Sequence, residues 1–196
     1  MKLSILVCSI VTRKPFLERL MLCLEPQLID DVELLVACDD GEISIGAKRN
    51  YLIEQSTGDY VCFVDDDDTL GSTYVSDIIA AMDQKPDCIG FLVRRLVNGK
   101  PDPKDAIHSL RFAAWGETKQ DGKTYYCRTP NHLNPIRREI AVKVPFKAID
   151  FAEDRDYSQR ITPLLKSEVY IDKPLYIYDY RSQRPGEVTH LTRAKR

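Results

Sequence analysis

The sequence predicts a single α/β domain in which a mainly parallel sheet is flanked by helices. The first half of the chain alternates short β-branched runs with amphipathic stretches, a pattern typical of parallel strands joined by helices. The length of 196 residues is that of one ordinary domain. With 43 % hydrophobic and 30 % charged residues, the composition is that of a globular protein rather than a disordered one.

The first two strands are predicted over residues 3–9 and 32–38, and the second is closed by Asp39-Asp40-Gly41. Between them, a helix is expected to begin near Pro15, because positions 17, 20, 21 and 24 form one apolar face. Pro26 is expected to end this helix.

Two further helices alternate with the next two strands. The second helix is predicted from about residue 44 to 56, with Gly58 as its C-terminal stop. Strands follow over residues 60–64 and 88–93. The third helix lies between them and is expected to use Ser72 as its N-cap.

The second half is less regular. Asp121-Gly122 predicts a hairpin turn. A short helix leading to a strand edge is expected in residues 134–144, and a longer helix from residue 153 that Pro163 kinks or ends. Residues 168–181 predict two short strands broken at Lys173-Pro174, and the basic residues 181–196 predict a mobile or ligand-ordered tail.

The charges of the two halves differ in sign. Residues 1–90 hold 7 Lys/Arg and 17 Asp/Glu, a net charge of −10, whereas residues 91–196 hold 21 and 13, a net charge of +8. This pattern indicates an acidic half that attracts cations beside a basic half that attracts anions, although two solvated faces would give the same counts.

The composition also indicates in which cellular compartment the protein is expected. No apolar run approaches the ~20 residues that a membrane span needs. The six cysteines lie mostly within apolar runs and none is paired as CxxC. We therefore expect reduced core thiols in a cytoplasmic protein rather than zinc ligands or a disulfide framework.

The run Asp65–Asp68 directly follows the predicted strand 60–64. Ligands of parallel α/β sheets gather beyond the carboxyl ends of the strands. Because side chains two apart on a strand point the same way, Asp65 and Asp67 are expected to face one ligand together. Two carboxylates that close repel unless a cation lies between them, and hard oxygen ligands suit Mg²⁺ or Mn²⁺. A solvated acidic loop is the alternative.

Several stretches together resemble the GT-A-fold glycosyltransferases, specifically the family 2-like group. These stretches are "SILVCSIVTRKPFL", "VELLVACDDG", "GAKRNYLIEQSTGDYVCFVDDDD", "NPIRREIAVKVPF" and "FAEDRDYSQRI". The resemblance implies a single GT-A (Rossmann-like) domain. Residues 1–90 would form its nucleotide-sugar-binding half, and residues 91–196 its acceptor-binding half with a basic C-terminal tail.

The resemblance implies roles for individual residues. Asp39 would accept hydrogen bonds from the base of a nucleoside diphosphate sugar, most often uracil. The remaining nucleotide-binding positions would be Thr12, Arg13, Lys48, Arg49, Asn50, Asp65 and Asp66, the last at the variable position of the D-x-D-D motif. Asp67 would be the main metal ligand, assisted by Asp65 and by His190 of the tail, while Asp68 would hold the loop or meet the sugar.

Each of these positions also has a simpler interpretation. Asp39 caps a turn, Thr12 and Arg13 begin a helix, and Lys48, Arg49 and Asn50 form a solvated helix face. Asp66 is then a bystander and His190 a surface histidine. His132 is expected to pack a loop or face the acceptor, and Trp115, the single tryptophan, to pack or to stack on a sugar or base.

The pair Glu153-Asp154 opens the predicted helix at residue 153. The resemblance implies that Asp154 is the catalytic base of an inverting sugar transfer. A base in this position typically contributes ~10²–10⁴-fold to the rate. In the alternative, both carboxylates only stabilise the helix N-terminus, where the dipole favours their charged form.

We therefore expect a metal-dependent inverting glycosyltransferase. It would move one sugar from a nucleoside diphosphate sugar, which the resemblance implies is a UDP-sugar, to an acceptor hydroxyl. Two alternatives are a nucleotidyltransferase of related fold and a non-catalytic nucleotide-sugar-binding protein. The basic half predicts an anionic acceptor, with nucleic acid, a phosphorylated lipid and a saccharide left open. Its basic side chains include Arg94, Arg95, Arg128, Arg137, Arg138 and Arg181.

Overall fold

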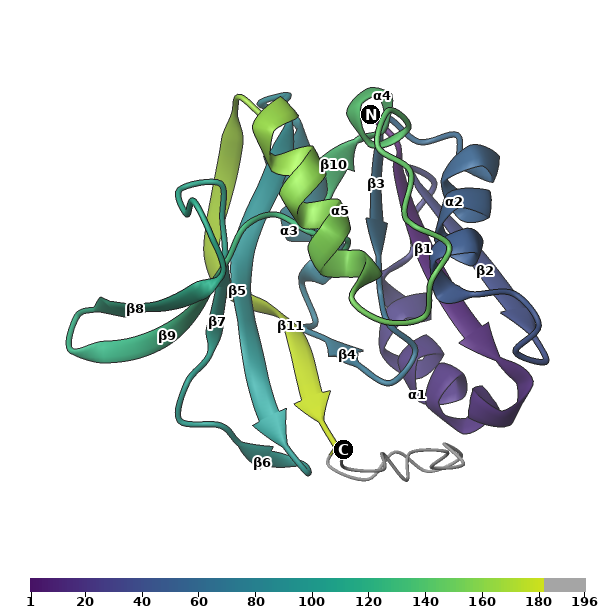
Figure 1. The fold of residues 1–196 in the computed structure, drawn as a ribbon, viewed down its shortest axis with the longest axis horizontal. Helices are drawn as coiled ribbons and strands as arrows, with labels where there is room; N and C mark the ends of the chain where they lie inside the picture. The colour runs from purple at the N-terminus through teal and green to yellow at the C-terminus, as the bar shows by residue number, and fades with distance from the viewer. Residues whose placement is uncertain (182–196) are drawn as a thin grey trace, which may run out of the picture.

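The computed structural model describes residues 1–181 of the chain. The proposed metal ligand His190 and nearly all of the basic tail lie outside the described residues. Within them the predicted α/β architecture is confirmed: helices cover both faces of one twisted sheet (Figure 1).

The first half contributes three parallel strands and three helices. The strands are β1 (Leu3–Ile10), β2 (Val32–Asp39) and β3 (Tyr60–Phe63), in the order β2-β1-β3. The α-helices are α1 (Lys14–Leu24), α2 (Ile45–Gln55) and α3 (Tyr74–Met82). Short 3-10 turns, η1 (Val11–Arg13) and η2 (Glu25–Gln27), flank α1.

The second half extends the same sheet. The remaining strands are β4 (Thr69–Leu70), which still belongs to the first half of the chain, β5 (Cys88–Val97), β6 (Lys100–Pro101), β7 (Ala106–His108), β8 (Gly116–Gln120), β9 (Lys123–Arg128), β10 (Ile136–Arg137) and β11 (Glu168–Tyr180). The helices of the second half are α4 (Arg138–Ala141), α5 (Glu153–Ile161) and the 3-10 turn η3 (Thr162–Leu164). Figure 1 shows α5 in front of the sheet and the β8–β9 hairpin projecting to the left.

Strand β10 joins the two halves of the sheet. It pairs antiparallel with β3 on one side and with β5 on the other, which gives the order β2-β1-β3-β10-β5-β7-β9-β8. Strand β11 lies parallel to β5 and antiparallel to β4. The sheet is therefore parallel across the first half and mixed across the second.

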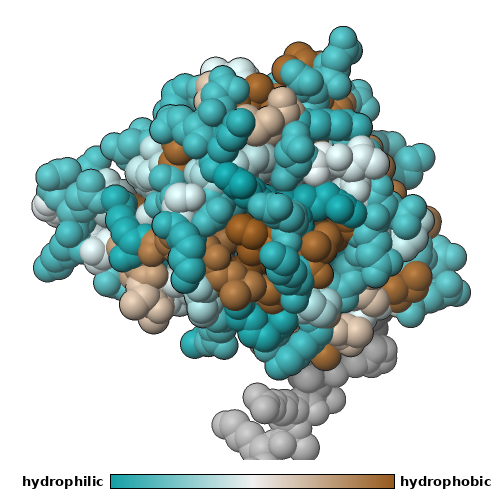
Figure 2. Space-filling model, turned by 90° about the horizontal axis from the view of Figure 1, so that it is seen from above, coloured by the Kyte–Doolittle hydropathy of each residue, from teal (hydrophilic) through white to brown (hydrophobic). Residues whose placement is uncertain are grey.

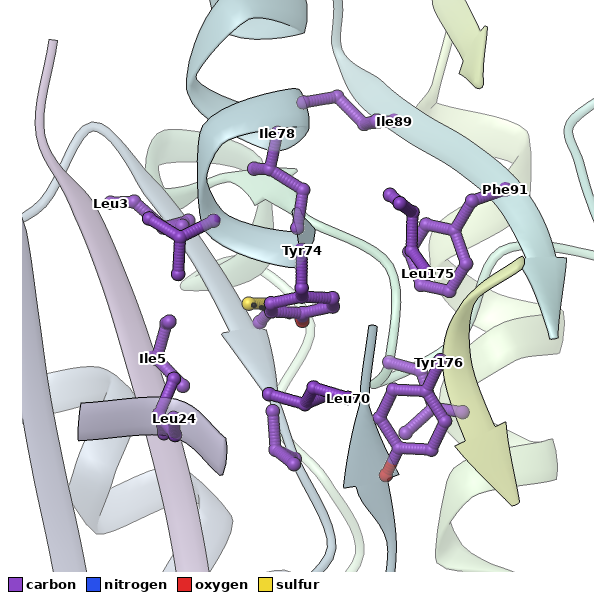
Figure 3. Packing of buried hydrophobic residues seen from close by; sticks show 14 of the residues in the cluster. Leu3, Ile5, Leu24, Leu70, Tyr74, Ile78, Ile89, Phe91, Leu175 and Tyr176 are labelled. Carbon is purple, nitrogen blue, oxygen red and sulfur yellow. Dashed lines mark hydrogen bonds between the residues drawn. The ribbon is translucent and has the colours of Figure 1, made fainter. Parts of the chain in front are cut away.

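Two apolar cores lie on opposite faces of the sheet. Leu3 and Ile5 of β1 point into the core beneath α1 and α3, and Leu6 points into the core beneath α2 and α5. In Figure 3, Tyr74 of α3 lies between the β1 residues and Tyr176 of β11. Burial on both faces explains why the strands are continuous apolar runs rather than alternating ones.

Four local expectations were wrong. In residues 134–144 the strand β10 precedes the helix α4, whereas the sequence predicted a helix leading to a strand edge. Helix α3 begins after Thr73, not at a Ser72 cap. Helix α2 ends at Gln55, and Gly58 instead allows a close approach, because a Cβ there would lie 2.7 Å from the backbone nitrogen of Ser4. Strand β11 is continuous through Pro174, where shifts in its register with β5 take the place of a break.

The surface of the described residues is largely hydrophilic on the face seen from above, with apolar side chains gathered near its centre (Figure 2). No helix within residues 1–181 is long and apolar enough to cross a membrane. All six cysteines are free thiols, and Cys62, Cys88 and Cys127 are buried.

The core beneath α3 predicts a large cost for Ile78→Ala. Ile78 is fully buried, so the truncation leaves a cavity and should lower the free energy of unfolding by about 2–5 kcal/mol. Leu22 on α1 is 78 % exposed, and Leu22→Ala should change the same quantity by less than about 0.5 kcal/mol. Urea denaturation of both variants measures the difference, and equal effects would contradict the assignment of the core.

Candidate active site

A cleft of about 620 Å³ lies beyond the carboxyl ends of β1 and β3, where ligands of parallel α/β sheets bind. One wall comes from the first half of the chain: the end of β1, Arg13, the start of α2 and the acidic turn. The opposite wall comes from β5, β7, β9, the loop 131–133 and the segment 150–154. The sequence-predicted residues that line it are Arg13, Lys48, Arg49, Asp65, Asp66, Asp67, His132, Trp115 and Asp154.

The four aspartates form a turn rather than the end of a strand. Strand β3 ends at Phe63, and the amide of Asp68 donates to the carbonyl of Asp65 at 3.1 Å. Asp65 and Asp67 are half-buried in the cleft wall, whereas Asp66 and Asp68 are buried. Asp65 and Asp67 therefore line the cleft together, as the sequence predicted. The cause is the geometry of the turn and not the two-residue period of a strand.

Asp65 is held by two nitrogen donors. Arg49 Nη2 lies 3.0 Å from one carboxylate oxygen and His132 Nε2 lies 3.2 Å from the other. Burial alone would raise the pKa of Asp65, but His132 and Arg49 outweigh it and hold the pKa well below its usual range. Asp65 is therefore a carboxylate at neutral pH.

Arg13 neutralises the two middle aspartates. Its Nε lies 3.0 Å from Asp66 Oδ1, and its Nη2 lies 3.0 Å from Asp67 Oδ2. Ser9 Oγ donates a further hydrogen bond of 2.6 Å to Asp66. The Asp66 carboxylate thus ties the turn to β1 and is not the bystander that the sequence suggested.

Asp68 is fixed to β11 behind the turn. The hydroxyl of Tyr176 donates to Asp68 Oδ2 at 2.7 Å and accepts from the amide of Asp65 at 3.0 Å. Burial, together with the charges of Asp65 and Asp67, holds the pKa of Asp68 well above its usual range. Of the two roles considered, Asp68 therefore holds the loop.

Arg49 connects the acidic turn to helix α5. Its Nη2 pairs with Asp65, and its Nε lies 3.4 Å from Glu153 Oε1. The guanidinium is buried over the rings of Phe63 and Phe146, at 4.8 and 5.6 Å from their centroids. Burial would lower the pKa of Arg49, but the charge of Asp65 outweighs it, so the side chain stays protonated.

Asp154 lies in the first turn of α5, which starts after Ala152 in a left-handed conformation (φ 63°). The segment before it is fastened to α2. Asn50 donates to the carbonyl of Phe146 at 2.9 Å and accepts from its amide at 2.7 Å. Gly46 lets the segment pass, because a Cβ there would lie 1.8 Å from the carbonyl oxygen of Lys147. Asn50 thus positions this segment and does not line the cleft.

Asp39 and Thr12 lie beside the cleft rather than in its lining. The Asp39 carboxylate accepts from the amides of Gly41 (3.2 Å) and Ile43 (2.9 Å) and from the ammonium of Lys48. The hydrogen bond from Lys48 is the main reason that the pKa of Asp39 is lowered. Thr12 is exposed in η1.

The carboxylates of the cleft fit a divalent ion that the protein would bind together with substrate phosphates. Among residues 1–181, no three or more His, Cys, Asp or Glu side chains form a cluster that could hold a metal alone. Asp65 and Asp67 present carboxylate oxygens to the cleft. Mg²⁺ is commonly bound by one or two carboxylates plus substrate phosphates, and Asp65 and Asp67 fit that arrangement.

The cleft contains side chains that sequence patterns did not single out. His108 on β7 is buried against Phe91, and burial lowers its pKa to about 3, so its ring is neutral. Glu153 was expected only as a helix-terminal charge, yet it pairs with Arg49. No local sequence motif marks His108 or Glu153, because their contacts with Phe91 and Arg49 join segments that are distant in the chain.

Comparisons with known proteins show one family and one fold for this chain. The model of the family "Glycosyl transferase family 2" matches residues 13–143. The chain also resembles S. aureus TarS 1–349 in complex with UDP-GlcNAc, with a TM-score of 0.70 and 18 % identity over 94 % of this chain and 60 % of that one. The complex of TarS 1–349 with UDP gives a TM-score of 0.67 at 18 % identity, again over 60 % of that chain and 91 % of this one.

The similar structures are longer than this chain, which spans 60 % of TarS 1–349 and 37 % of the longer TarS structure. The likeness at 18 % identity shows that the fold is the predicted GT-A fold. A short stretch of 72 residues is 36 % identical to the ATP-dependent RNA helicase HAS1 of Saccharomyces cerevisiae, over 14 % of that protein, which is too little to show a family.

The buried position of Arg49 predicts a strong and pH-dependent effect of Arg49→Met. Removing the guanidinium leaves Asp65 and Glu153 without their cation, and should lower the free energy of unfolding at pH 7 by roughly 3–5 kcal/mol. Because the folded-state pKa of Asp65 is depressed, its pairing stabilises the fold above the unfolded pKa of about 3.9 and is lost as the pH falls below it. The difference between Arg49→Met and the wild type should therefore shrink from pH 7 to pH 3.

Urea denaturation at several pH values measures this dependence. Arg155→Met is the matched control, because Arg155 is exposed on α5, the helix that carries Glu153, and the change should cost less than about 0.5 kcal/mol. A cost for Arg49→Met that stays constant with pH would contradict the ion-pair account.

Proposed function

Because the chain belongs to glycosyl transferase family 2, we propose that it transfers one sugar from a UDP-sugar to an acceptor hydroxyl, with inversion at the anomeric carbon. The observation that carries the proposal is that a single cleft holds the acidic turn and, from a distant segment, Asp154. TarS, which is similar in fold, was solved in complex with UDP-GlcNAc and with UDP. The family match favours sugar transfer over the alternative of a nucleotidyltransferase.

The donor is placed along the first-half wall of the cleft. The uracil lies near the loop that Asp39 organises, and the diphosphate lies near the acidic turn. Arg13 and Lys48 line this wall and supply positive charge beside the carboxylates. A divalent ion, Mn²⁺ or Mg²⁺, held by Asp67 and Asp65 together with the phosphates would stabilise the charge that develops on the departing UDP.

Asp154 acts as the general base. The acceptor oxygen attacks the anomeric carbon on the face opposite UDP, and a new C–O bond forms as the bond to the diphosphate breaks. The acceptor proton passes to the Asp154 carboxylate and UDP leaves with the bonding electron pair. Arg49 positions this base indirectly, because it fixes the neighbouring Glu153 to the acidic turn.

Two further parts of the proposal concern the setting of the reaction. We propose transfer of a single sugar per acceptor rather than polymerisation. The free thiols support a cytoplasmic location, since such compartments keep cysteines reduced. Detection of the product by mass spectrometry distinguishes one added sugar from a chain.

Asp67→Ala should abolish the metal-dependent part of UDP binding. Calorimetric titration of the wild type with UDP should show at least tenfold tighter binding with Mn²⁺ than without, because Asp67 would hold an ion that neutralises charge on the diphosphate. The variant should bind UDP equally with and without Mn²⁺. Asp40→Ala removes an exposed carboxylate next to Asp39 and is the control. A Mn²⁺ effect that survives in Asp67→Ala would exclude Asp67 as the ligand.

Asp154→Asn should slow turnover without weakening the donor complex. An amide cannot accept the proton, so hydrolysis of UDP-GlcNAc should fall by about 10²–10⁴-fold while the Kd for UDP is unchanged. Asp156→Asn is a matched control, because it removes the same charge from the first turn of α5 at a side chain that pairs with Lys147 and Arg160. Equal losses of activity in the two variants would indicate that Asp154 serves the helix N-terminus and not the reaction.

A further inference from the structure

The wall of the cleft opposite the acidic turn carries an arginine without a carboxylate partner. Four arginines line the cleft. Arg13, Arg49 and Arg95 are each within 3.2 Å of a carboxylate oxygen. Arg128, at the end of β9, forms no ion pair with any residue in the part of the chain that the structure describes. It is half-buried, so this unpaired charge is partly withdrawn from water.

Aromatic rings and backbone carbonyls hold the Arg128 guanidinium in place. It lies over the ring of Trp115 at 4.8 Å and over that of Tyr126 at 5.4 Å. The Trp115 ring is itself fixed, because its Nε1 donates to Thr129 Oγ1 at 3.0 Å and to Ser158 Oγ at 3.3 Å. A stacked guanidinium is oriented before any ligand binds.

Only one nitrogen of Arg128 is used by the described residues. Nη1 donates to the carbonyls of Cys127 at 2.9 Å and Gly116 at 3.4 Å. Nε and Nη2 donate to no residue in the range 1–181, so one edge of the guanidinium fork is available to a ligand. Two parallel N–H donors match the oxygens of a phosphate or carboxylate.

The charges around Arg128 attract an anion next to the proposed base. Arg95 is near enough that its charge, added to burial, lowers the pKa of Arg128, and the carboxylate of Asp154 acts in the opposite direction. Arg128 and Asp154 line the same cleft, so a group held by Arg128 lies in the cleft that contains Asp154. The residues proposed to bind the donor lie instead on β1, η1, α2 and the acidic turn.

We propose that the acceptor carries a phosphate group, which Arg128 binds on the Trp115 side of the cleft so that a nearby acceptor hydroxyl lies at Asp154. This inference rests on the proposed function, because it names the chemistry of that acceptor. The arginine edge fixes the charged end of the acceptor, and the base receives the proton from its hydroxyl end. Acceptors without the phosphate lack this anchor and bind more weakly.

The single tryptophan provides a reporter for the test. Inorganic phosphate is titrated into the protein with and without saturating UDP, and Trp115 emission and the heat of binding are followed. UDP occupies the donor site, so phosphate binding in its presence reports another site. The wild type should bind phosphate more tightly than acetate. Arg128→Gln should weaken phosphate at least tenfold, and Arg128→Lys, which keeps the charge but not the fork, should lie between them.

Arg94→Gln is the control, because Arg94 is exposed on β5, pairs with Asp105 and does not line the cleft. Its affinity for phosphate should equal that of the wild type. Transfer from UDP-GlcNAc is then compared with glycerol 3-phosphate and glycerol as acceptors. The phosphorylated acceptor should have at least a tenfold lower KM in the wild type and Arg94→Gln, and no advantage in Arg128→Gln.

The possible outcomes separate this inference from the proposed function. Absent phosphate binding in the wild type, equal phosphate binding by Arg128→Gln, or equal use of the two acceptors by the wild type would overturn the inference. Weaker UDP binding in Arg128→Gln would also overturn it, since Arg128 would then serve the donor. A wild type that binds neither UDP nor UDP-GlcNAc would instead refute the proposed function, whereas the phosphate titration without UDP would still report on Arg128.

Discussion

The candidate site depends on the burial of one arginine between two carboxylates that come from distant parts of the chain. Arg49 pairs with Asp65 after β3 and with Glu153 at the start of α5. A buried guanidinium without partners would be costly, and so would the buried carboxylate of Glu153 and the half-buried carboxylate of Asp65 without a cation. The three groups therefore require one another, and meeting that requirement fixes the position of α5 relative to the sheet. Asp154 is placed in the cleft as a consequence, because it directly follows Glu153.

The acidic turn shows how the fold tolerates four adjacent carboxylates. Each one is compensated differently: Asp65 by Arg49 and His132, Asp66 and Asp67 by Arg13, and Asp68 by a raised pKa and the Tyr176 hydroxyl. Asp65 and Asp67 are the less buried of the three that line the cleft. A cation that binds there competes with Arg13 for Asp67. A bound diphosphate offers Arg13 an alternative partner, so donor and metal binding are expected to favour each other.

The sequence predicted the parallel first half of the sheet and the position of the acidic run, because both follow from patterns of residues that are close together in the chain. The apolar runs of β1, β2 and β3 and the stripe of α1 have no strong alternative interpretation. Asn50 and Asp66 show where such prediction ends. The sequence proposed nucleotide-binding roles for both, and it did not predict their contacts within the fold, in which Asn50 bonds to the backbone of Phe146 and Asp66 to Ser9 and Arg13. Their partners lie 96 and 53 or more positions away in the chain, and no periodicity signals a contact over that separation.

The acidic and basic halves of the sequence contribute opposite walls of one cleft. Acidic side chains with paired arginines form the wall at which we propose that the donor binds, and Arg95 and Arg128 lie on the opposite wall with Tyr126 and Trp115. Several arginines in the described part of the basic half are already engaged: Arg94 with Asp105, Arg95 with Asp102, and Arg137 with Asp87 and Glu139. Net charge alone would have spread the expected anion site over all of them. Ion pairing reduces the choice within the cleft to Arg128, which is the residue that lies beside the proposed base.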